Sequence, residues 1–580
     1  MLPPMHTKHP DRRAFLVLSA AGLLAAACDS GDGSAARLGT DGAPPDAEPG
    51  DGGLADAEPQ DAGPGDAGPV DAQEDAGPDA EVPEPPWPEP PPVDAPEAPV
   101  LPGAPFTLGV ASGDPLPDAV VLWTRLAPEP LHPDGLGGLS ADSPIPVIWE
   151  VALDAELSAV VARGFAWAEA EVAFSLRVDV TGLRPGRPYW YRFRVGDAWS
   201  SPVGQARTAP APGAAVAQAR FAVATCQHYK SGFYAAHRHL AEAAPELVFF
   251  VGDYIYENGG PGPVRDHDGP TTFTLPAYRN RYALYRTDAD LQAAHAACPW
   301  VVTWDDHEVV NNYAGGADRS PADLERRAAA YRAWWEHMPT RLPPPEGPDL
   351  RIYRSFGWGD LFDAAVLDTR QYRDAQPCND DVGPLCPEVV GEPRTLLGAE
   401  QRAWLDGVLR GSQARWRVVA QQVLMVPLTV NGTFVNPDQW DGYPSDRQAL
   451  LDAVADRPDA SLLVLTGDFH AAALTDLHRQ ADDLASPLAG HEVMATSISS
   501  GGGGAEGNTL RALGNLAARQ PGVHHFNAID RGFALIDLDH TGYTVDFRAV
   551  EDVTRADSAP RLDRSYRIEI DGAVIRLDGG

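Results

Sequence analysis

The sequence predicts an α/β domain that follows a small all-β unit, and three observations support this. Residues 106–210 contain short segments in which apolar and polar residues alternate, separated by glycine- and proline-containing turns. From Arg220 onward, short apolar runs alternate with helical segments, which is typical of a sheet covered by helices. Five of these runs end on residues that can bind cations or phosphate. A chain of 580 residues is also too long for a single core.

The all-β unit is clearest at residues 146–153, 175–180 and 189–195, where apolar residues recur at every second position. The turn signal Leu183-Arg-Pro-Gly-Arg-Pro stands just before the last of these segments. Several short strands with such turns indicate a β-sandwich. The segment holds no paired acids, ligand cluster or nucleophile motif, so we expect its role to be structural.

Residues 1–28 are predicted to be an export signal. Arg12 and Arg13 precede an alanine-rich apolar stretch, which resembles a twin-arginine signal and is too short for a membrane span. The stretch ends at Cys28 in a sequence that resembles a lipoprotein cleavage site, although Ala25 stands where leucine is usual. We therefore expect export by the twin-arginine machinery to the periplasm or cell surface, with lipid on Cys28 as the sole membrane attachment. Ordinary cleavage that removes Cys28 is the alternative.

Residues 29–103 are predicted to be a disordered tether. Between residues 29 and 100 the chain has 19 acidic residues against one basic residue, Arg37, which is about half of the net charge of −37. Acidic, proline-rich repeats cannot bury apolar surface and stay extended. The negative charge also argues against a nucleic-acid-binding surface, which needs a basic footprint. We expect no partner subunit and treat the chain as a monomer.

The five apolar runs of the α/β domain share one property, which is the chemistry of the residues that follow them. Residues 221–225 precede Cys226, 246–251 precede Gly252-Asp253, 299–304 precede Asp305-Asp306-His307-Glu308, 361–367 precede Asp368-Thr-Arg370, and 461–466 precede Gly467-Asp468-Phe469-His470. Ligands collect at the carboxyl ends of strands in sheets covered by helices. One aspartate after a strand is usually a cap or loop residue, but several at one edge would repel each other unless a cation lies between them. The pattern predicts a metal site.

The segment Gly252-Asp253-Tyr254-Ile255-Tyr256 is the strongest element of this site. The Asp253 carboxylate can bridge two cations, and Gly252 lets the backbone turn sharply behind it. Tyr256 can reach back as a phenolate, and Cys226 can supply a thiolate; both favour a highly charged ion such as Fe(III). The alternatives are that Tyr256 packs beside a loop and that Cys226 is a small buried apolar residue.

Two further segments supply oxygen and imidazole ligands. Asp468 and His470 are two residues apart, so an extended backbone points both side chains the same way; the alternative is that Asp468 caps a helix at residues 471–477. In the other segment, Asp306, Asn311 or Asn312 can bind the second cation, and the sequence does not choose between Asp306 and the two asparagines. Oxygen ligands suit Ca, Mg or Mn. His307 can protonate the leaving oxygen because imidazole titrates near neutrality.

Taken together, these motifs resemble the PhoD family of bacterial alkaline phosphatases and phosphodiesterases, which is related to purple acid phosphatases. The matching segments are residues 109–125, 224–227, 252–257, 285–288, 304–313, 368–373, 467–470 and 497–501. The resemblance covers residues 106–550. One departure is Thr225, where serine before the cysteine is common.

The resemblance implies a four-layer αββα metallophosphatase domain over residues 217–575, preceded by a fibronectin III-like sandwich over residues 104–212. It also implies one Fe(III) and one or two Ca ions, with Mg or Mn as substitutes for Ca. The implied iron ligands are Cys226, Asp253, Tyr256 and His470, and the implied calcium ligands are Asp253, Asp468 and a residue from 306–312.

The expected activity is hydrolysis of a phosphate mono- or diester by a metal-activated hydroxide. Arg370 would clamp the phosphate, or would form a surface ion pair instead. Two alternatives stay open: a phospholipase D-type diesterase, and a surface binding protein without catalysis. A metal-sulfur redox protein is disfavoured because only Cys226 lies in the cluster. Cys378 and Cys386 flank a seven-residue loop that an exported protein can close as a disulfide.

Overall fold

The computed structural model describes residues 84–577 except 268, 318–319, 382–385, 392, 428, 431–432, 435, 458, 460 and 502–516. The expected signal with Cys28, and the expected tether as far as residue 83, lie outside the described residues. Within the described part of the chain, no helix combines the length and the apolar character needed to cross a membrane.

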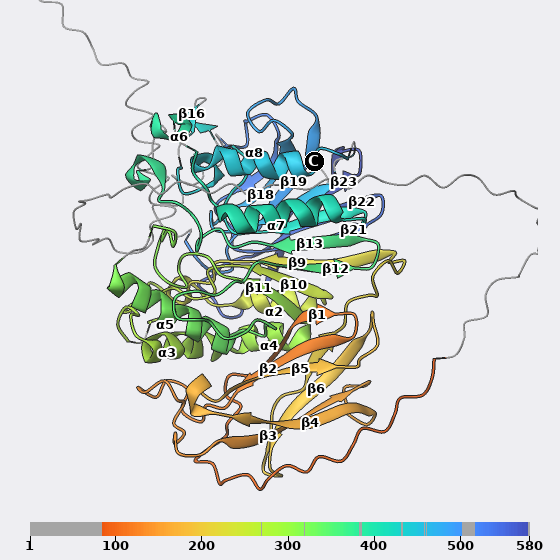
Figure 1. Cartoon of the computed structure of the whole chain (residues 1–580), viewed down its shortest axis with the longest axis vertical. Helices are drawn as coiled ribbons and strands as arrows, with labels where there is room; N and C mark the ends of the chain where they lie inside the picture. Colours follow the sequence, from red (N-terminus) through yellow and green to blue (C-terminus); the bar gives the residue numbers. More distant parts are fainter. Residues whose placement is uncertain are drawn as a thin grey trace, which may run out of the picture. The chain divides into compact units, whose positions relative to one another are not determined.

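Two β-sheets pack face to face at the centre of the fold (Figure 1). The ten-stranded sheet has the order β24 (Val574–Arg576), β23 (Pro560–Glu569), β22 (Gly542–Val550), β21 (Gly532–Asp539), β9 (Gln218–Ala224), β10 (Leu247–Val251), β11 (Pro299–Thr303), β1 (Val110–Leu116), β2 (Ala119–Arg125) and β5 (Ser175–Thr181). The seven-stranded sheet has the order β12 (Arg354–Trp358), β13 (Phe362–Val366), β14 (Trp416–Ala420), β17 (Leu462–Thr466), β19 (Leu488–Met494), β18 (Ala472–His478) and β20 (Val523–Asn527).

Strand β9 shows how the core is built. Its Phe221 and Val223 point into the apolar layer between the two sheets, whereas Ala222 and Ala224 point to the helices on the other face. This follows from the period of two in a strand, and burial on both faces is why the run is continuously apolar.

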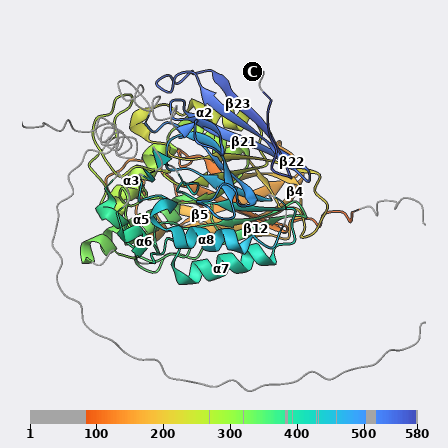
Figure 2. The ribbon, with the colours of Figure 1, turned by 90° about the horizontal axis from the view of Figure 1, so that it is seen from above.

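Helices cover both outer faces of the sheet pair. The face of the ten-stranded sheet carries α2 (Ala235–Glu242), α3 (Leu275–Arg286), α4 (Ala289–Ala297) and α5 (Pro321–His337). The face of the seven-stranded sheet carries α7 (Gly398–Gly411) and α8 (Pro444–Ala453), which lie side by side (Figures 1 and 2). The predicted α/β class and its four αββα layers are therefore confirmed.

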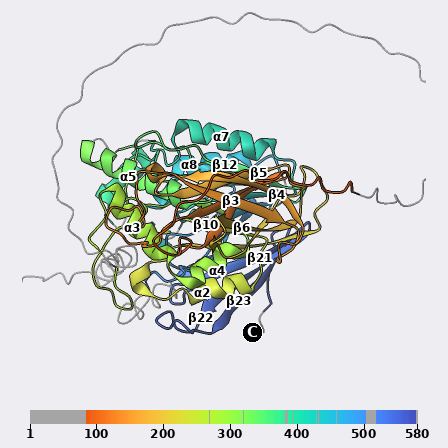
Figure 3. The ribbon, with the colours of Figure 1, turned by 90° about the horizontal axis from the view of Figure 1, so that it is seen from below.

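The N-terminal β region is joined to the larger domain through its sheet. A five-stranded sheet has the order β4 (Val160–Ala168), β3 (Ile145–Ala152), β6 (Pro188–Val195) and β7 (Trp199–Ser200), with β8 (Gly204–Arg207) paired to β6. Its strands β3, β4 and β6 face the viewer in Figure 3. The opposing strands β1, β2 and β5 extend the ten-stranded sheet, because β1 pairs in parallel with β11. The sequence predicted a sandwich over residues 104–212, and the structure adds that three of its strands continue the ten-stranded sheet. The pairing of β1 with β11 also covers a strand edge that would otherwise be open.

The junction between these strands depends on a close backbone approach. A Cβ at Gly113 of β1 would lie 2.3 Å from the carbonyl oxygen of Pro339 and 2.5 Å from that of Trp300. Only glycine fits there. At the end of the expected tether, the carbonyls of Pro90 and Pro91 accept hydrogen bonds from Arg163 of β4, so this part of residues 29–103 contacts the β region.

Short elements connect the layers. They are η1 (Ala170–Val172), η2 (Tyr229–Ser231), η3 (Pro377–Asp380), η4 (Trp440–Gly442), α6 (Glu388–Gly391), β15 (Thr429–Val430) and β16 (Thr433–Phe434). One local alternative is wrong: residues 471–477 do not form a helix capped by Asp468. They form β18, which hydrogen-bonds to β19 and β20 on its two sides, so sheet pairing overrides the helical preference of the alanines.

Candidate metal centre

The loops after five strands bring ligand atoms to one edge of the sheet pair. Strands β9, β10 and β11 are parallel neighbours in one sheet, and β13, β14 and β17 are parallel neighbours in the other. Three groups of side chains each place their ligand atoms within 4.8 Å of one another. They are Cys226 with Asp253 and His470, Asp253 with Asp306 and His307, and Asp305 with Asp306 and Asp468.

Two glycines make this convergence possible. Gly252 has a φ of 104°, and a Cβ there would lie 2.4 Å from the Cβ of Asp305. A Cβ at Gly467 would lie 2.4 Å from Oγ1 of Thr225, on the other sheet. The loops of the two sheets can approach this closely only without side chains at these positions.

Five candidate ligands have a left-handed backbone, which is unusual for residues other than glycine. They are Cys226 (φ 54°), Asp253 (57°), Asn312 (53°), Asp468 (58°) and His470 (55°). This differs from the extended segment expected for Asp468 and His470; tight turns present both side chains instead. Such strained positions cluster where a site requires a particular side-chain direction.

Tyr256 faces the other predicted iron ligands. Its hydroxyl donates to Oδ2 of Asp253 at 2.8 Å and lies 3.1 Å from Nε2 of His470. The hydroxyl of Ser500 lies 2.8 Å from the Tyr256 oxygen and 2.7 Å from the carbonyl oxygen of Cys226. The structure thus groups Cys226, Asp253, Tyr256 and His470, and Ser500 joins them without having been assigned a role from sequence.

Arg370 is buried among carboxylates. Its Nε contacts Asp305, its Nη1 lies 2.9 Å from Asp438, and its Nη2 lies 2.9 Å from Asp468 and 3.7 Å from Asp306. The alternative of a surface ion pair is wrong, because the side chain has no exposed area. Asp438 was missed from sequence because it does not directly follow a core strand, and only the fold brings it to Arg370.

His307 is oriented by Glu257, whose role the sequence did not show. Nδ1 of His307 lies 2.7 Å from Oε2 of Glu257, and the backbone N–H of His307 donates to Oδ1 of Asp306 at 3.0 Å. Burial opposes protonation, but the charges of Glu257, Asp306 and Asp253 outweigh it and raise the pKa of His307 well above its usual value. The ring is held with Nε2 as its remaining polar end.

Asn312 is anchored to Asp306. Its backbone N–H donates to Oδ2 of Asp306 at 2.6 Å, and its side-chain nitrogen Nδ2 donates to Oδ2 of Asp380 at 2.8 Å. The neighbouring Asn311 uses its backbone N–H to bind Glu257 at 3.1 Å. Both Asp306 and Asn312 therefore stand at the centre.

The electrostatics of the centre favour a bound cation. Burial raises the pKa of Asp253 and of Asp468 well above the usual value; neighbouring carboxylates add to this, and the charges of His307 at Asp253 and of Arg370 at Asp468 offset only part of it. Burial and then the charge of Asp253 also raise the pKa of the Cys226 thiol. For Asp306, burial is outweighed by Arg370 and His307, and its pKa is lowered. A bound cation would reverse the upward shifts and favour the anionic ligands.

The residues present fit cations. Oδ2 of Asp305 is buried without a hydrogen-bond partner among the described residues, although such oxygens are normally satisfied. The donor set pairs a thiol, a phenol and an imidazole on one side with carboxylate and amide oxygens on the other. The first set suits Fe(III), and the second suits an oxygen-preferring divalent ion.

An αββα fold with such a centre at the carboxyl ends of strands from both sheets defines a metallophosphatase. The family model described as "PhoD-like phosphatase" matches residues 221–547, and that described as "PhoD-like phosphatase, N-terminal domain" matches residues 94–210. Alkaline phosphatase D of Bacillus subtilis is 44% identical over 495 residues, which is 83% of each chain. The chain belongs to the PhoD-like phosphatase family and is a metal-dependent phosphoester hydrolase.

Solved structures agree. The structure of PhoD superposes with a TM-score of 0.78 at 42% identity, over 83% of this chain and 94% of that one. A purple acid phosphatase from yellow lupin seeds superposes with a TM-score of 0.50 at 12% identity, over 81% and 75% of the two chains, which shows the shared fold alone. The alternative of a non-catalytic binding protein is set aside, since every expected ligand type stands at the centre.

The remaining cysteines occupy other places. Cys378 and Cys386 form a disulfide with their Cα atoms 5.5 Å apart. Cys226 and Cys298 are buried thiols. Burial raises the pKa of Cys298, which lies away from the ligand groups and packs in the core beside the helices.

Proposed function

We propose that the chain hydrolyses phosphate esters at a centre of one Fe(III) and one or two Ca ions, with Mg or Mn able to replace Ca. The observation that carries this is the position of Asp253. It belongs both to the group with Cys226 and His470 and to the group with Asp306 and His307. A carboxylate shared by two ligand groups is suited to bridge two cations.

The assignment of residues to the two cations follows from their chemistry. Cys226, Tyr256 and His470 would hold Fe(III) together with Asp253, because thiolate and phenolate stabilise a highly charged ion. Asp253, Asp306, Asn312 and Asp468 would hold the oxygen-preferring ion. When bound, the cations would supply an acidified water as nucleophile and would withdraw charge from the phosphoryl oxygens.

His307 is proposed to protonate the leaving alkoxide. Glu257 occupies Nδ1, so the proton is delivered from Nε2. The same contact keeps the ring in one orientation as charge develops. Replacing Glu257 would therefore disturb both the direction and the acidity of the donor.

Arg370 is proposed to act through the carboxylates. Its three nitrogens contact Asp305, Asp438 and Asp468, so it neutralises and orients side chains at the second cation. To clamp a phosphate, as the sequence suggested, the guanidinium must release one of these carboxylates. Arg370 thus has its first role in positioning Asp468.

The proposal extends to location. The twin-arginine pattern at Arg12-Arg13 and the following apolar stretch support export, and Cys28 supports a lipid anchor. Fractionation of cells expressing the full chain and a Cys28→Ser variant tests this. The wild type should sediment with membranes, whereas the variant should be released; equal release of both contradicts the anchor.

Turnover of p-nitrophenyl phosphate and of bis(p-nitrophenyl) phosphate tests the activity. Both should be measured with and without chelator, and after Fe and Ca are returned separately and together. We expect turnover that chelation abolishes and that both ions restore, while the ratio of the two rates defines mono- or diester preference. Undiminished turnover in protein shown to be metal-free would contradict the mechanism.

A further inference from the structure

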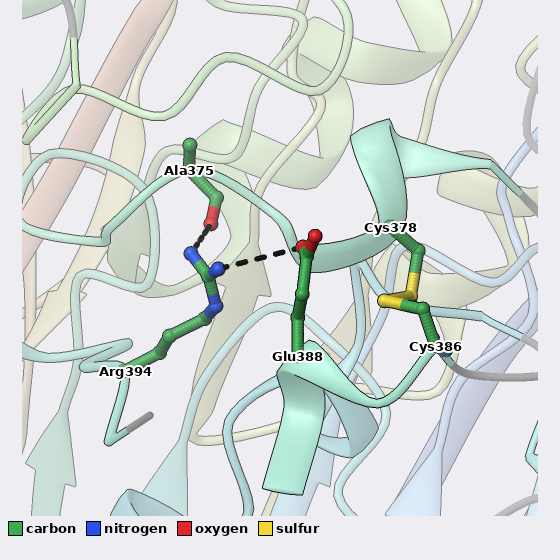
Figure 4. Close-up of a disulfide and its surroundings, with 5 residues drawn as sticks. All are labelled: Ala375, Cys378, Cys386, Glu388 and Arg394. Carbon is green, nitrogen blue, oxygen red and sulfur yellow. Dashed lines mark hydrogen bonds and ion pairs between the residues drawn. A yellow bond between two sulfur atoms is a disulfide. The ribbon is translucent and has the colours of Figure 1, made fainter. Parts of the chain in front are cut away.

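Residues 378–381 of the loop that the Cys378–Cys386 disulfide closes lie beside the centre. Arg394 links the segments on the two sides of the disulfide. It donates to the carbonyl oxygen of Ala375 at 3.2 Å and lies 3.7 Å from Glu388 of α6 (Figure 4). Ala375 precedes the first cysteine and Glu388 follows the second. The two ends of the loop are therefore tied together twice, covalently and by Arg394.

The backbone inside this loop is strained. Cys378, Asn379 and Asp380 are consecutive residues with φ of 63°, 55° and 59°. Left-handed residues other than glycine normally occur singly, because Cβ crowds the following carbonyl oxygen. Three in succession persist only where the surrounding structure enforces them. The disulfide begins at the first of the three and supplies such a constraint.

The strained turn places the Asp380 carboxylate beside Asn312, a candidate ligand. Oδ2 of Asp380 accepts the hydrogen bond from Nδ2 of Asn312 at 2.8 Å. Gln376, just before the loop, donates to the backbone carbonyl oxygen of Asn312 at 2.8 Å and to Oδ1 of Asp438 at 2.7 Å. Asn312 is thus held by its side chain and by its backbone from the same segment.

The direction of the side-chain bond decides what Asn312 can do. An amide has one donor end and one acceptor end, and a cation binds only the acceptor oxygen. Because Asp380 accepts from the nitrogen, the oxygen Oδ1 is the end that remains for a cation. An acceptor in this position selects the ligating orientation of the amide, as outer partners of metal ligands generally do.

We propose that residues 378–380, which the disulfide anchors, are a positioning device for the second cation, in which Asp380 holds the Asn312 amide with its oxygen toward the ion. In this proposal Asp380 is a positioning residue that acts through Asn312. This inference rests on the proposed function, because it takes Asn312 as a ligand of the oxygen-preferring ion. A disulfide that only stabilised the fold would change the melting temperature and leave cation affinity unchanged.

Calcium affinity tests the proposal. The protein as isolated is freed of Ca with a calcium-selective chelator and titrated with Ca²⁺ alone by isothermal titration calorimetry. Four variants are compared with wild type: Asp380→Ala, the Cys378→Ser/Cys386→Ser pair, all three changes together, and Asp381→Ala as the matched control. Asp381 is the exposed neighbour of Asp380 and bonds through its backbone N–H to Cys378.

We expect Asp380→Ala to bind Ca²⁺ about tenfold to a hundredfold more weakly, as is usual when an outer partner of a metal ligand is removed. The cysteine pair should weaken binding too. The triple variant should be no weaker than Asp380→Ala, because both changes act on the same contact. Asp381→Ala should match wild type. Raising Ca²⁺ should restore kcat in Asp380→Ala with KM for the ester little changed.

Three outcomes overturn the proposal: wild-type affinity in Asp380→Ala, wild-type affinity in the cysteine pair with only a lower melting temperature, and additive losses in the triple variant. Cysteine variants are used because a thiol reductant would also reduce iron. Visible absorption of the iron centre and thermal unfolding check that each variant is folded. Wild-type protein that binds Ca²⁺ but turns over no ester contradicts the proposed function alone, whereas wild-type protein that binds no Ca²⁺ overturns this inference.

Discussion

The five-stranded sheet and the ligand edge of the central sheets bury opposite kinds of side chain. In β6, Tyr189, Tyr191 and Phe193 are fully buried, and the alternating Arg192 and Arg194 lie at the surface beside Glu150. At the ligand edge the buried side chains are carboxylates, a thiol and imidazoles, drawn together by strained turns.

The difference shows that the two regions are stabilised in different ways. Apolar burial in β6 needs no ligand, because removing these rings from water is itself favourable. Buried carboxylates are unfavourable unless charge compensates them, and Arg370 compensates only part of the cluster. The first region should respond to mutation in stability, and the second in cation binding and activity.

The largest effect is expected from Asp253→Asn. Loss of the shared carboxylate should lower kcat by at least about 10³-fold, or about 4 kcal/mol of transition-state stabilisation. Turnover of p-nitrophenyl phosphate and elemental analysis of bound metal would measure this. Asp537→Asn, at a partly exposed position of β21, is the control and should keep wild-type turnover. Activity of Asp253→Asn within tenfold of wild type would show that the carboxylate does not bridge.

A comparable effect, but on stability, is expected from Phe193→Ala. Removing a fully buried phenyl ring should lower the free energy of unfolding by about 3–5 kcal/mol. Chemical denaturation would measure the loss, and kcat per folded molecule should stay unchanged. Phe165→Ala removes an exposed ring of the same region and should change stability by less than about 0.5 kcal/mol. Equal losses in both variants would contradict the contrast.

An intermediate effect is expected from removal of metal, and it depends on pH. Without cations, the folded-state pKa values of Asp253, Asp468 and His307 all lie above their unfolded values. The stability that proton uptake supplies is complete below the unfolded pKa values and is lost as pH rises through the folded ones. Each tenfold difference in proton affinity between the folded and unfolded states corresponds to about 1.4 kcal/mol. The melting temperature of metal-free protein should therefore fall from pH 5 to pH 8 relative to loaded protein. If the difference in melting temperature between metal-free and loaded protein stayed constant from pH 5 to pH 8, the prediction would be wrong.

The smallest effect is expected from Arg220→Ala. Arg220 pairs with Asp537 at 2.7 Å on the surface, where both side chains are nearly half exposed. Such a pair contributes less than about 1 kcal/mol, and salt weakens it. Unfolding measured at low and high salt should show a small difference that disappears at high salt. A loss above about 2 kcal/mol would mean that the site is not solvated as described.

Much of the fold and of the ligand set could be predicted, because both depend on local patterns. The buried parallel strands β9, β10, β11 and β17 appear as apolar runs, and the carboxyl end of a strand predicts where its next side chain lies. Cys226, Asp253 and His470 were placed in one centre on this ground, and the structure brings them together.

What the sequence did not show depends on long-range contacts. Asp438, Ser500 and Asp380 do not directly follow a core strand, so only the folded loops bring them to Arg370, Tyr256 and Asn312. The pairing of β1 with β11 was also hidden, because the two strands are far apart in the chain. The sheet pairing of β18 overrides its helical composition for the same reason.

Tyr256 and His470, whose side chains meet at 3.1 Å, are 214 residues apart in the chain. A short zinc-binding motif gathers its ligands from neighbouring residues and can guide folding, but here the ligands come from segments far apart in the chain, so the unfolded chain has no complete site. The full ligand set is assembled only after both sheets have formed and docked. Metal content per chain therefore reports completed folding: in a purified sample, it measures the fraction of molecules whose two sheets have docked.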